Sequence, residues 1–279
     1  MNVFGGATSL LDKAPRGPPG PRGKDGTIVD LCTWMPNTII RSLHENDESG
    51  AFFIENLDKD IIRSSSMNES DGTDITQWVS RSVRGGNMIA KKPTKDVEKI
   101  EDIFDTDRYA LKFKTAHYYA SQSPFLLSGI GTCGFICITF RTNSESEQVL
   151  LCGSEPSHHH QPTIPASEIK ISGATEITIQ IHSVKEIIQF PLKGWITLFV
   201  EYNADNKLSH FTYDVNGTMG SFTAPSSNHA KLGLHLGCRY DDTRYFDGQI
   251  ASLETYSNYT YGTPLPDSFK DIVIQNQKI

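Results

Sequence analysis

From residue 73 onward, short runs of apolar residues alternate with polar positions. In Ile177-Thr178-Ile179-Gln180-Ile181 every second residue is apolar, as in a strand that buries one face. Comparable runs, rich in β-branched and aromatic residues, are separated by Gly, Asn, Asp, Pro and Ser. They cover residues 135–141, 149–152, 176–182, 186–190, 195–202, 210–215, 232–238 and 249–256. With turn signals at Asp205-Asn206 and Asn216-Gly217, the pattern predicts a mostly β, antiparallel sandwich.

Several segments, in this order, carry a resemblance to a known superfamily. They are residues 75–80, 108–113, 116–119, 133–142, 194–202, Tyr213-Asp214-Val215-Asn216-Gly217, 232–237 and 245–256. Their succession resembles the laminin G-like and concanavalin-like jelly rolls and covers residues 73–265. The resemblance implies a jelly-roll head. That superfamily includes lectins, adhesion modules, pentraxins, enzymes and parts of viral fibres, so it implies no single function.

The last predicted strand of this head suggests roles for three of its residues. Gly248 is expected to permit a tight turn. Ile250 and Leu253 are expected to face the core from a closing strand.

A collagen-like run lies near the start of the chain, at Gly17-Pro18-Pro19-Gly20-Pro21-Arg22-Gly23-Lys24-Asp25-Gly26. It is either a Pro/Gly-rich linker in polyproline conformation or a short triple helix. Three triplets are too few to hold three chains together unless a neighbouring trimeric domain aligns them. The strict spacing favours the trimer, with Gly17, Gly20, Gly23 and Gly26 at its axis.

The segments around this run complete the domain organisation. Residues 1–16 lack periodicity and are expected to form a flexible tail. Residues 27–72 are expected to form a small mixed α/β neck, with a helix after Pro36 and strands at 51–55 and 59–63. The aromatic residues of the neck are expected to pack against copies of it or against the head. Residues 266–279 are a C-terminal extension.

Composition and charge narrow the choice of partners. The 279 residues carry a net charge of −7, and residues 27–72, with nine anions and three cations, account for −6 of it. Because there is no sizeable basic patch, nucleic acid is not an expected partner. No apolar run approaches the ~18 residues of a membrane span, so membrane insertion is not expected. The start of the chain lacks the features of a secretory signal.

The cysteines favour folding in a reducing compartment. There are five, an odd and widely spaced set, which favours buried free thiols over a disulfide framework. They are Cys32, Cys133, Cys137, Cys152 and Cys238.

No catalytic signature stands out. A glycoside hydrolase needs two carboxylates about 5–9 Å apart. Glu145-Ser146-Glu147 has alternating acids but lies in a stretch with loop composition. Nucleophile-elbow, Walker and metalloprotease motifs are absent from the sequence, so an enzyme is not expected.

Binding residues are expected in the loops between the last strands. Tyr240, Asp242, Arg244 and Tyr245 combine aromatic rings with polar groups, which suits recognition of a sugar or a protein, and a purely structural role for the tyrosines stays open. Calcium is a possible cofactor, because Asp214, Asp241, Asp242 and Asp247 are loop carboxylates in a superfamily where calcium is common. Ordinary turn chemistry is the alternative for these aspartates. His158-His159-His160 is either an exposed loop or a metal site, adventitious or on a trimer axis.

Tail, collagen-like rod, acidic neck and β head together resemble the virion spike or head-fibre proteins of double-stranded DNA viruses and virus-like transposons. The resemblance implies a homotrimer at the virion surface. Residues 1–16 would anchor in a capsid vertex or penton-like protein, and the head would bind a host-cell receptor or glycan. Three heads on one stalk would offset weak single-site affinity.

The alternative is a secreted, collagen-stalked lectin-like or adhesion protein of a eukaryote. It requires that a signal peptide has been removed, and it would give a role to the sequons at Asn68, Asn216 and Asn258. Disulfides would favour this alternative, whereas free thiols would favour the virion fibre.

Overall fold

A computed structural model of the chain gives the architecture. It describes residues 53–54, 75–78, 88–100, 108–114, 116–121, 133–154, 167–205, 207–226, 233–239, 243–258, 270–271 and 273–274. Residues 1–16, the collagen-like run with Gly17, Gly20, Gly23 and Gly26, and most of the neck lie outside these ranges. The predictions for those segments therefore stay predictions.

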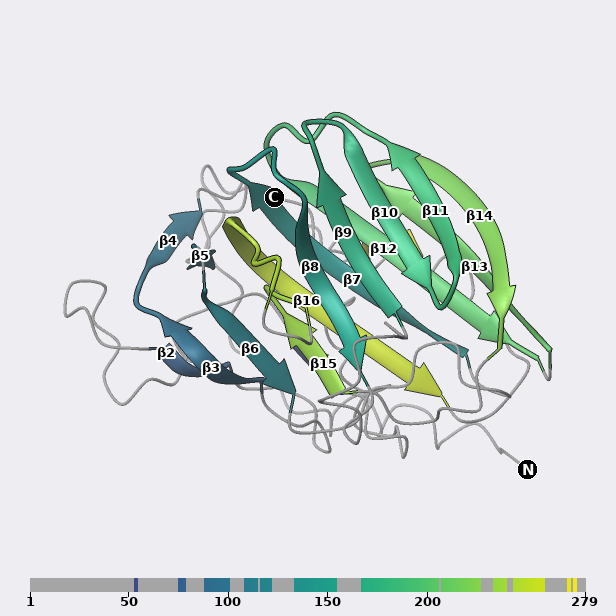
Figure 1. Ribbon diagram of the computed structural model, residues 1–279, viewed down its shortest axis with the longest axis horizontal. Helices are drawn as coiled ribbons and strands as arrows, with labels where there is room; N and C mark the ends of the chain where they lie inside the picture. Colours follow the sequence, from purple (N-terminus) through teal and green to yellow (C-terminus); the bar gives the residue numbers. More distant parts are fainter. Residues whose placement is uncertain are drawn as a thin grey trace, which may run out of the picture.

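Two antiparallel sheets form the head (Figure 1). The first sheet has the order β14-β13-β12-β7-β16-β5-β4, and β1 also pairs with β16. Its strands are β1 (Phe53–Ile54), β4 (Val97–Ile100), β5 (Arg108–Phe113), β7 (Cys133–Thr142), β12 (Ile196–Ala204), β13 (Leu208–Val215), β14 (Thr218–Pro225) and β16 (Gly248–Asn258). The short β1 falls inside the strand predicted at residues 51–55.

The second sheet has the order β11-β10-β9-β8-β15-β6-β3-β2. Its strands are β2 (Ile75–Trp78), β3 (Met88–Thr94), β6 (Tyr118–Ser121), β8 (Gln148–Ser154), β9 (Ser167–Ser172), β10 (Glu176–Ile181), β11 (Val184–Gln189) and β15 (Gly233–Leu236). In Figure 1, β8 to β11 overlie β7, β12 and β16 of the first sheet. The mostly β, two-sheet sandwich predicted from alternation is confirmed.

One hydrophobic core fills the space between the sheets. Ile136 and Ile138 of the first sheet and Ile169 and Ile179 of the second belong to the same buried cluster. These residues occupy alternate positions on their strands, so each sheet turns one face inward. Burial of this apolar surface is the main favourable term in folding, at about 25 cal/mol per Å².

The hairpin predicted at Asn216-Gly217 is confirmed. Val215 pairs with Thr218, and the two residues between them have φ values of 47° and 93°. Positive φ at both central positions is the type I′ geometry that joins twisted strands, and Asn-Gly is its preferred sequence.

The reason given for Gly248 is wrong. Gly248 lies in β16, paired with Phe113 and Thr142, rather than in a turn. A Cβ atom there would overlap the Arg141 carbonyl oxygen and would lie 2.6 Å from Cζ of Phe246. Close approach of a backbone and a ring therefore requires the glycine. Ile250 and Leu253 are fully buried in the core, as predicted.

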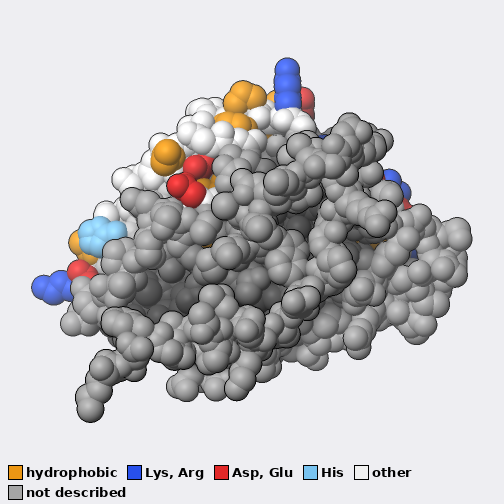
Figure 2. Space-filling model, turned by 180° about the vertical axis from the view of Figure 1, so that it is seen from behind, with side chains coloured by type: hydrophobic (Ala, Val, Ile, Leu, Met, Phe, Trp, Pro, Cys, Tyr) orange, Lys and Arg blue, Asp and Glu red, His pale blue; other side chains and the backbone are white. Residues whose placement is uncertain are grey.

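The C-terminal extension contacts the outer face of the first sheet. Lys270 Nζ lies 2.6 Å from Glu201 Oε2, and Val273 and Ile274 are buried. Figure 2 shows the molecule from behind, with hydrophobic and charged side chains interspersed along the described rim. No helix among the described residues is long and apolar enough to cross a membrane.

Candidate functional site

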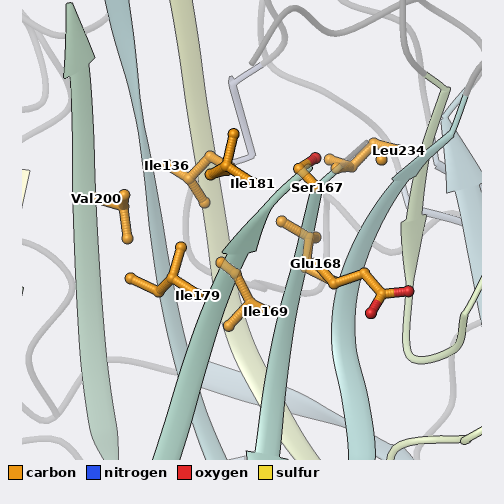
Figure 3. A pocket seen from close by; sticks show the side chains of 10 residues that line it. Ile136, Ser167, Glu168, Ile169, Ile179, Ile181, Val200 and Leu234 are labelled. Atoms are coloured by element: carbon orange, nitrogen blue, oxygen red, sulfur yellow. The ribbon is translucent and has the colours of Figure 1, made fainter. Parts of the chain in front are cut away.

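A small cavity lies between the two sheets. Its volume is about 10 Å³, room for about one water molecule. Figure 3 shows it enclosed by Ile136, Ile179, Ile181 and Val200 from both sheets. The carboxylate of Glu168 points away from these side chains (Figure 3). This cavity is therefore too small for a sugar or a similar ligand.

A continuous row of polar and aromatic side chains crosses the outer face of the second sheet. We name it the outer strip: Lys92, Tyr118, Cys152, Glu168, Lys170, His235, Arg239 and Tyr245. The strand residues of the strip alternate with core residues Tyr119, Leu151, Ile169, Leu234 and Leu236. Because successive side chains of a strand point to opposite faces, the strip faces away from the core.

At one end of the strip, Lys92 is surrounded by two tyrosines. Its Nζ donates a 2.7 Å hydrogen bond to the Tyr245 hydroxyl. The same Nζ lies 5.0 Å from the Tyr245 ring centroid and 5.8 Å from that of Tyr118. These distances suit cation–π attraction, which fixes the ammonium group between the rings. Tyr118 in turn stacks on His235, with centroids 6.2 Å apart and an interplanar angle of 25°.

At the other end, Glu168 is a buried carboxylate between two cations. Arg239 Nε donates to Oε1 over 2.7 Å, and Lys170 Nζ lies 3.4 Å from Oε2. The Lys170 contact has an ion-pair distance but not hydrogen-bond geometry, because Oε2 has no hydrogen-bond partner among the described residues. Only 1% of the Glu168 side chain is exposed, so the two cations compensate a charge that would otherwise be costly to bury.

Strand pairing connects the two ends of the outer strip. Cys152 of β8 is paired with both His235 of β15 and Glu168 of β9. Its Sγ lies 4.0 Å from Glu168 Oε1. The strip is therefore contiguous rather than two separate clusters.

The loop that supplies Arg239 and Tyr245 is held by backbone hydrogen bonds. Arg239 N–H donates to Thr243, and Phe246 N–H donates to Gly237. Val149 N–H of β8 donates to Arg244 over 2.8 Å. These bonds hold residues 237–239 and 243–246 in place beside β8.

The structure separates Arg244 from Tyr245, two residues that the sequence placed in one binding cluster. Arg244 has a φ of 53° and pairs with Glu147 of the β7–β8 loop, where both side chains are exposed. Tyr245 turns onto the outer strip instead. Left-handed backbone is unusual for arginine and is often found at functional sites. Tyr240 and Asp242, the other members of that cluster, lie outside the described residues.

The described residues give the calcium prediction no geometric support. Asp214 Oδ1 accepts the Gly217 N–H over 2.6 Å, which is the turn chemistry named as the alternative. Within the described ranges, no group of three or more His, Cys, Asp and Glu side chains could hold a metal ion. Asp241, Asp242 and His158-His159-His160 lie outside those ranges, so calcium or a histidine metal site stays a prediction.

Sequence reasoning missed most of the strip. Lys92 was missed because β3 contains Pro93, which is unusual inside a sheet, and a register irregularity between Ala90 and Lys92. The usable signal was alternation: Tyr118 and His235 flank buried Tyr119, Leu234 and Leu236 and so had to face outward.

Three of the five cysteines are free and buried, as predicted: Cys137, Cys152 and Cys238. Burial raises the pKa of the Cys137 thiol well above its usual value, and the charges of Glu254 and Asp214 raise it further. Such a thiol is unreactive in the folded protein.

No protein-family model matches the chain, and comparison with curated proteins finds no relative. Solved structures do match. A mutant GH54 α-L-arabinofuranosidase soaked with 4-nitrophenyl α-L-arabinofuranoside is 10% identical with a TM-score of 0.54, covering 86% of this chain and 64% of that one. An arabinofuranosidase complexed with arabinofuranosyl-α-1,2-xylobiose is 10% identical with a TM-score of 0.50, covering 73% and 51%.

A third match is the CBM40 domain of the Ruminococcus gnavus IT-sialidase bound to α2,3 sialyllactose. It is 15% identical with a TM-score of 0.43, covering 59% of this chain and 95% of that one. The chain spans less than two thirds of each arabinofuranosidase. At these identities, the two arabinofuranosidase matches show a shared β fold.

Proposed function

We propose that the β-sandwich is a glycan-binding head and that it binds sugar without cleaving it. The observation that carries this proposal is the outer strip, where Tyr118 and Tyr245 lie beside the donors of Lys92. Rings that pack on the apolar faces of a sugar, with adjacent donors for its hydroxyls, are typical of carbohydrate recognition. The fold is shared with an α-L-arabinofuranosidase, which is consistent with a carbohydrate ligand but does not select one.

Binding is favoured over hydrolysis by the composition of the strip. Hydrolysis requires two carboxylates flanking the bond to be cleaved. The strip as defined contains one carboxylate, Glu168, and both of its oxygens face cations. Glu145 and Glu147, the alternating acids of the sequence, lie in the β7–β8 loop and not on the strip.

A glycan array probed with the labelled full-length chain tests the proposal. We expect a subset of glycans to bind, and a panel of polysaccharides incubated with the same protein to yield no product. Absence of binding to every glycan would overturn the proposal. Release of sugar by the purified full-length chain would replace it with a hydrolase.

We further propose that the head belongs to a trimeric virion fibre, anchored through residues 1–16 in a capsid vertex and attached to a host receptor or glycan. The support is the collagen-like run and the three free, buried thiols, which suit folding in a reducing compartment. Light scattering should give about three times 31.0 kDa for the intact chain, and a monomer mass would overturn the fibre.

The secreted, collagen-stalked adhesion protein remains the second candidate. Its sequon at Asn216 is poorly disposed for modification, because Nδ2 donates to the Trp195 carbonyl and Oδ1 accepts from Thr197 N–H. Mass spectrometry of the protein expressed through a secretory pathway separates the two candidates: glycans and disulfides would favour the secreted one.

A further inference from the structure

The turn between β13 and β14 contains Asn216-Gly217, the one place in the sequence where glycine follows asparagine. In an unfolded chain the glycine nitrogen readily reaches the preceding asparagine side chain, because glycine has no Cβ that would block a close approach. The side-chain amide is then lost as ammonia, and an acidic residue replaces a neutral one. Both turn residues are exposed, so burial does not keep water from them.

Three hydrogen bonds with Trp195 and Thr197, at the start of β12, hold Asn216 in the folded head. Thr197 N–H donates to Asn216 Oδ1 over 2.8 Å, and Asn216 N–H donates to the Thr197 carbonyl over 3.1 Å. Asn216 Nδ2 donates to the Trp195 carbonyl over 3.1 Å. The side chain therefore has to break two hydrogen bonds before it rotates toward the Gly217 nitrogen.

The reacting nitrogen is held by a separate contact, since Gly217 N–H donates to Asp214 Oδ1 over 2.6 Å. Attack requires loss of this proton, and the resulting anion would lie beside a carboxylate of the same sign. Thr197 N–H polarises the Asn216 amide, which by itself favours attack, but an intramolecular reaction depends first on the approach of the two reacting atoms. We name these four hydrogen bonds the turn clamp.

We infer that Asn216 is a deamidation site, kept unreacted by the turn clamp and converted when the β13–β14 hairpin separates from β12. The Gly217 nitrogen loses its proton to solvent and bonds to Asn216 Cγ, while the Cγ–Nδ2 bond breaks and ammonia leaves. Water then opens the cyclic imide at the side-chain carbonyl, giving aspartate, or at the backbone carbonyl, giving isoaspartate. Water is the only co-reactant, and no atom is oxidised or reduced. The inference is independent of the proposed glycan-binding function.

Conversion would weaken the turn permanently. The aspartate formed from Asn216 has an oxygen where Nδ2 now donates, so it would face the Trp195 carbonyl as a second acceptor. Its charge would also lie near that of Asp214, which accepts from the next residue. Isoaspartate adds a methylene to the backbone, which does not fit the two-residue type I′ turn between Val215 and Thr218.

The experiment measures conversion of Asn216 in the folded full-length chain, in the same chain unfolded in urea, and in a synthetic peptide of residues 210–222. All samples are kept in mildly alkaline buffer, and the peptide is measured with and without urea. Peptide mapping by mass spectrometry separates asparagine, aspartate and isoaspartate over time. We expect the unfolded chain and the peptide to convert at similar rates. The folded chain should convert at least about tenfold more slowly, because about 1.4 kcal/mol of opening free energy lowers the reactive population tenfold.

Two variants test the turn clamp directly. Asp214→Ala removes the acceptor of the Gly217 N–H, so conversion in the folded chain should rise about fivefold. Asp205→Ala is the matched control, because its carboxylate also accepts two backbone N–H groups, but in the β12–β13 turn at the opposite end of β13. It should leave the rate at Asn216 within about twofold. Each folded rate is divided by the rate of the same variant in urea, and the denaturation midpoint establishes that each variant is folded during incubation.

A third variant, Asn216→Asp, reproduces one product of the reaction. It should lower the denaturation midpoint, because the hydrogen bond to the Trp195 carbonyl is lost. Asn143→Asp, at an exposed residue of the β7–β8 loop, is the matched control and should change the midpoint less. Equal midpoints for the two variants would contradict the weakening of the turn.

The rates decide the inference. Slow conversion in the folded chain that rises with Asp214→Ala, and not with Asp205→Ala, supports it. Conversion of the folded chain as fast as that of the peptide would overturn it, as would an absence of conversion in the unfolded chain. Equal effects of the two variants, or no effect of Asp214→Ala, would also overturn it, because protection would then not come from the turn clamp.

Discussion

Lys92 donates a 2.7 Å hydrogen bond to the hydroxyl of Tyr245, a residue 153 positions later in the chain. The bond joins β3, near the start of the head, to the loop that leads into its last strand. It therefore couples β3, the strand next to the edge of the second sheet, to the segment that leads into β16 of the first sheet. The same contact sets the position of the ammonium group on the outer strip, so stability and recognition share it.

A double-mutant cycle measures this contact. Tyr245→Phe keeps the ring and removes the acceptor, and Lys92→Met keeps most of the aliphatic chain and removes the charge. We expect each to lower the free energy of unfolding by about 0.5–1.5 kcal/mol, with a coupling energy of about 1 kcal/mol. Urea denaturation of the four proteins gives the values. Lys91→Met, at an exposed neighbour on β3, is the control, and additivity within error in the Lys92–Tyr245 cycle would contradict the coupling.

The ion pairs of Glu168 and Glu147 should differ sharply in their contribution to stability. Glu168 is 1% exposed at its side chain, so Glu168→Gln leaves Arg239 and Lys170 without their counter-charge in a desolvated site. We expect a loss of about 3–5 kcal/mol. Glu147 and Arg244 are 49% and 41% exposed, so Glu147→Gln should cost less than about 1 kcal/mol. Similar losses for both variants would show that burial does not govern the Glu168 pair.

Two glycines allow steric and conformational costs to be compared. Gly248→Ala forces a methyl group against the Arg141 carbonyl and the Phe246 ring, so we expect a loss of about 1–3 kcal/mol or more from overpacking. Gly173 has a φ of +64° and nothing within 4 Å of its added Cβ, so Gly173→Ala should cost only about 1–2 kcal/mol from left-handed backbone. Thermal denaturation of both variants checks the order, and a milder effect at Gly248 would refute the close approach.

The sequence pattern predicted some strands and not others. The runs at residues 135–141 and 176–182 were identified because each buries one face, and alternation reports burial directly. Strands β3 and β14 were not identified. Pro93 interrupts the β3 pattern, and β14 contains Gly220, which the Tyr213 ring covers. β3 is held as a strand by pairing with β2 and β6, whereas β14 pairs with β13 across the predicted Asn216-Gly217 hairpin.

Fewer residues of the outer strip than strands of the fold were predicted from the sequence. Tyr245 was singled out because aromatic and charged residues cluster beside it in sequence, and it does lie on the outer strip. Its partners Lys92 and Tyr118 come from β3 and β6, brought together by a register that no local pattern encodes. Glu168 and Arg239 are 71 positions apart and meet for the same reason.

Acid should weaken the β12–β13 turn through Asp205. Backbone N–H groups of Leu208 and Lys207 donate to its carboxylate and lower its pKa below the ordinary value of 3.8. Because the folded pKa is the lower one, this stabilisation is present above pH 4 or so. It is lost as the pH falls through the folded pKa.

The Asp205→Asn variant isolates this effect, because asparagine keeps an acceptor but does not titrate. The difference in free energy of unfolding between the native protein and the variant should be largest at about pH 6 and should shrink at about pH 3. Urea denaturation at the two values measures it. A difference that does not change with pH would contradict the role assigned to the carboxylate.

The boundary between neck and head is defined by the pairing of β1 with β16. Phe53 and Ile54 pair with Glu254 and Leu253 of β16. Strand β5 pairs with β16 only at residues 248–250, so β1 supplies ladder hydrogen bonds to a later part of the same strand. The head therefore uses residues that the sequence assigned to the neck.

Two truncations separate these assignments. Removing residues 1–49 deletes the tail and the collagen-like run but keeps β1, whereas removing residues 1–72 deletes β1 as well. Because both lack the run, both are expected to be monomeric by light scattering, and their stabilities can be compared directly. The shorter fragment should be less stable by about 1–3 kcal/mol, the value of two lost backbone hydrogen bonds. Equal stability would return β1 to the neck and place the boundary at residue 72, since the sheet would then be complete without it.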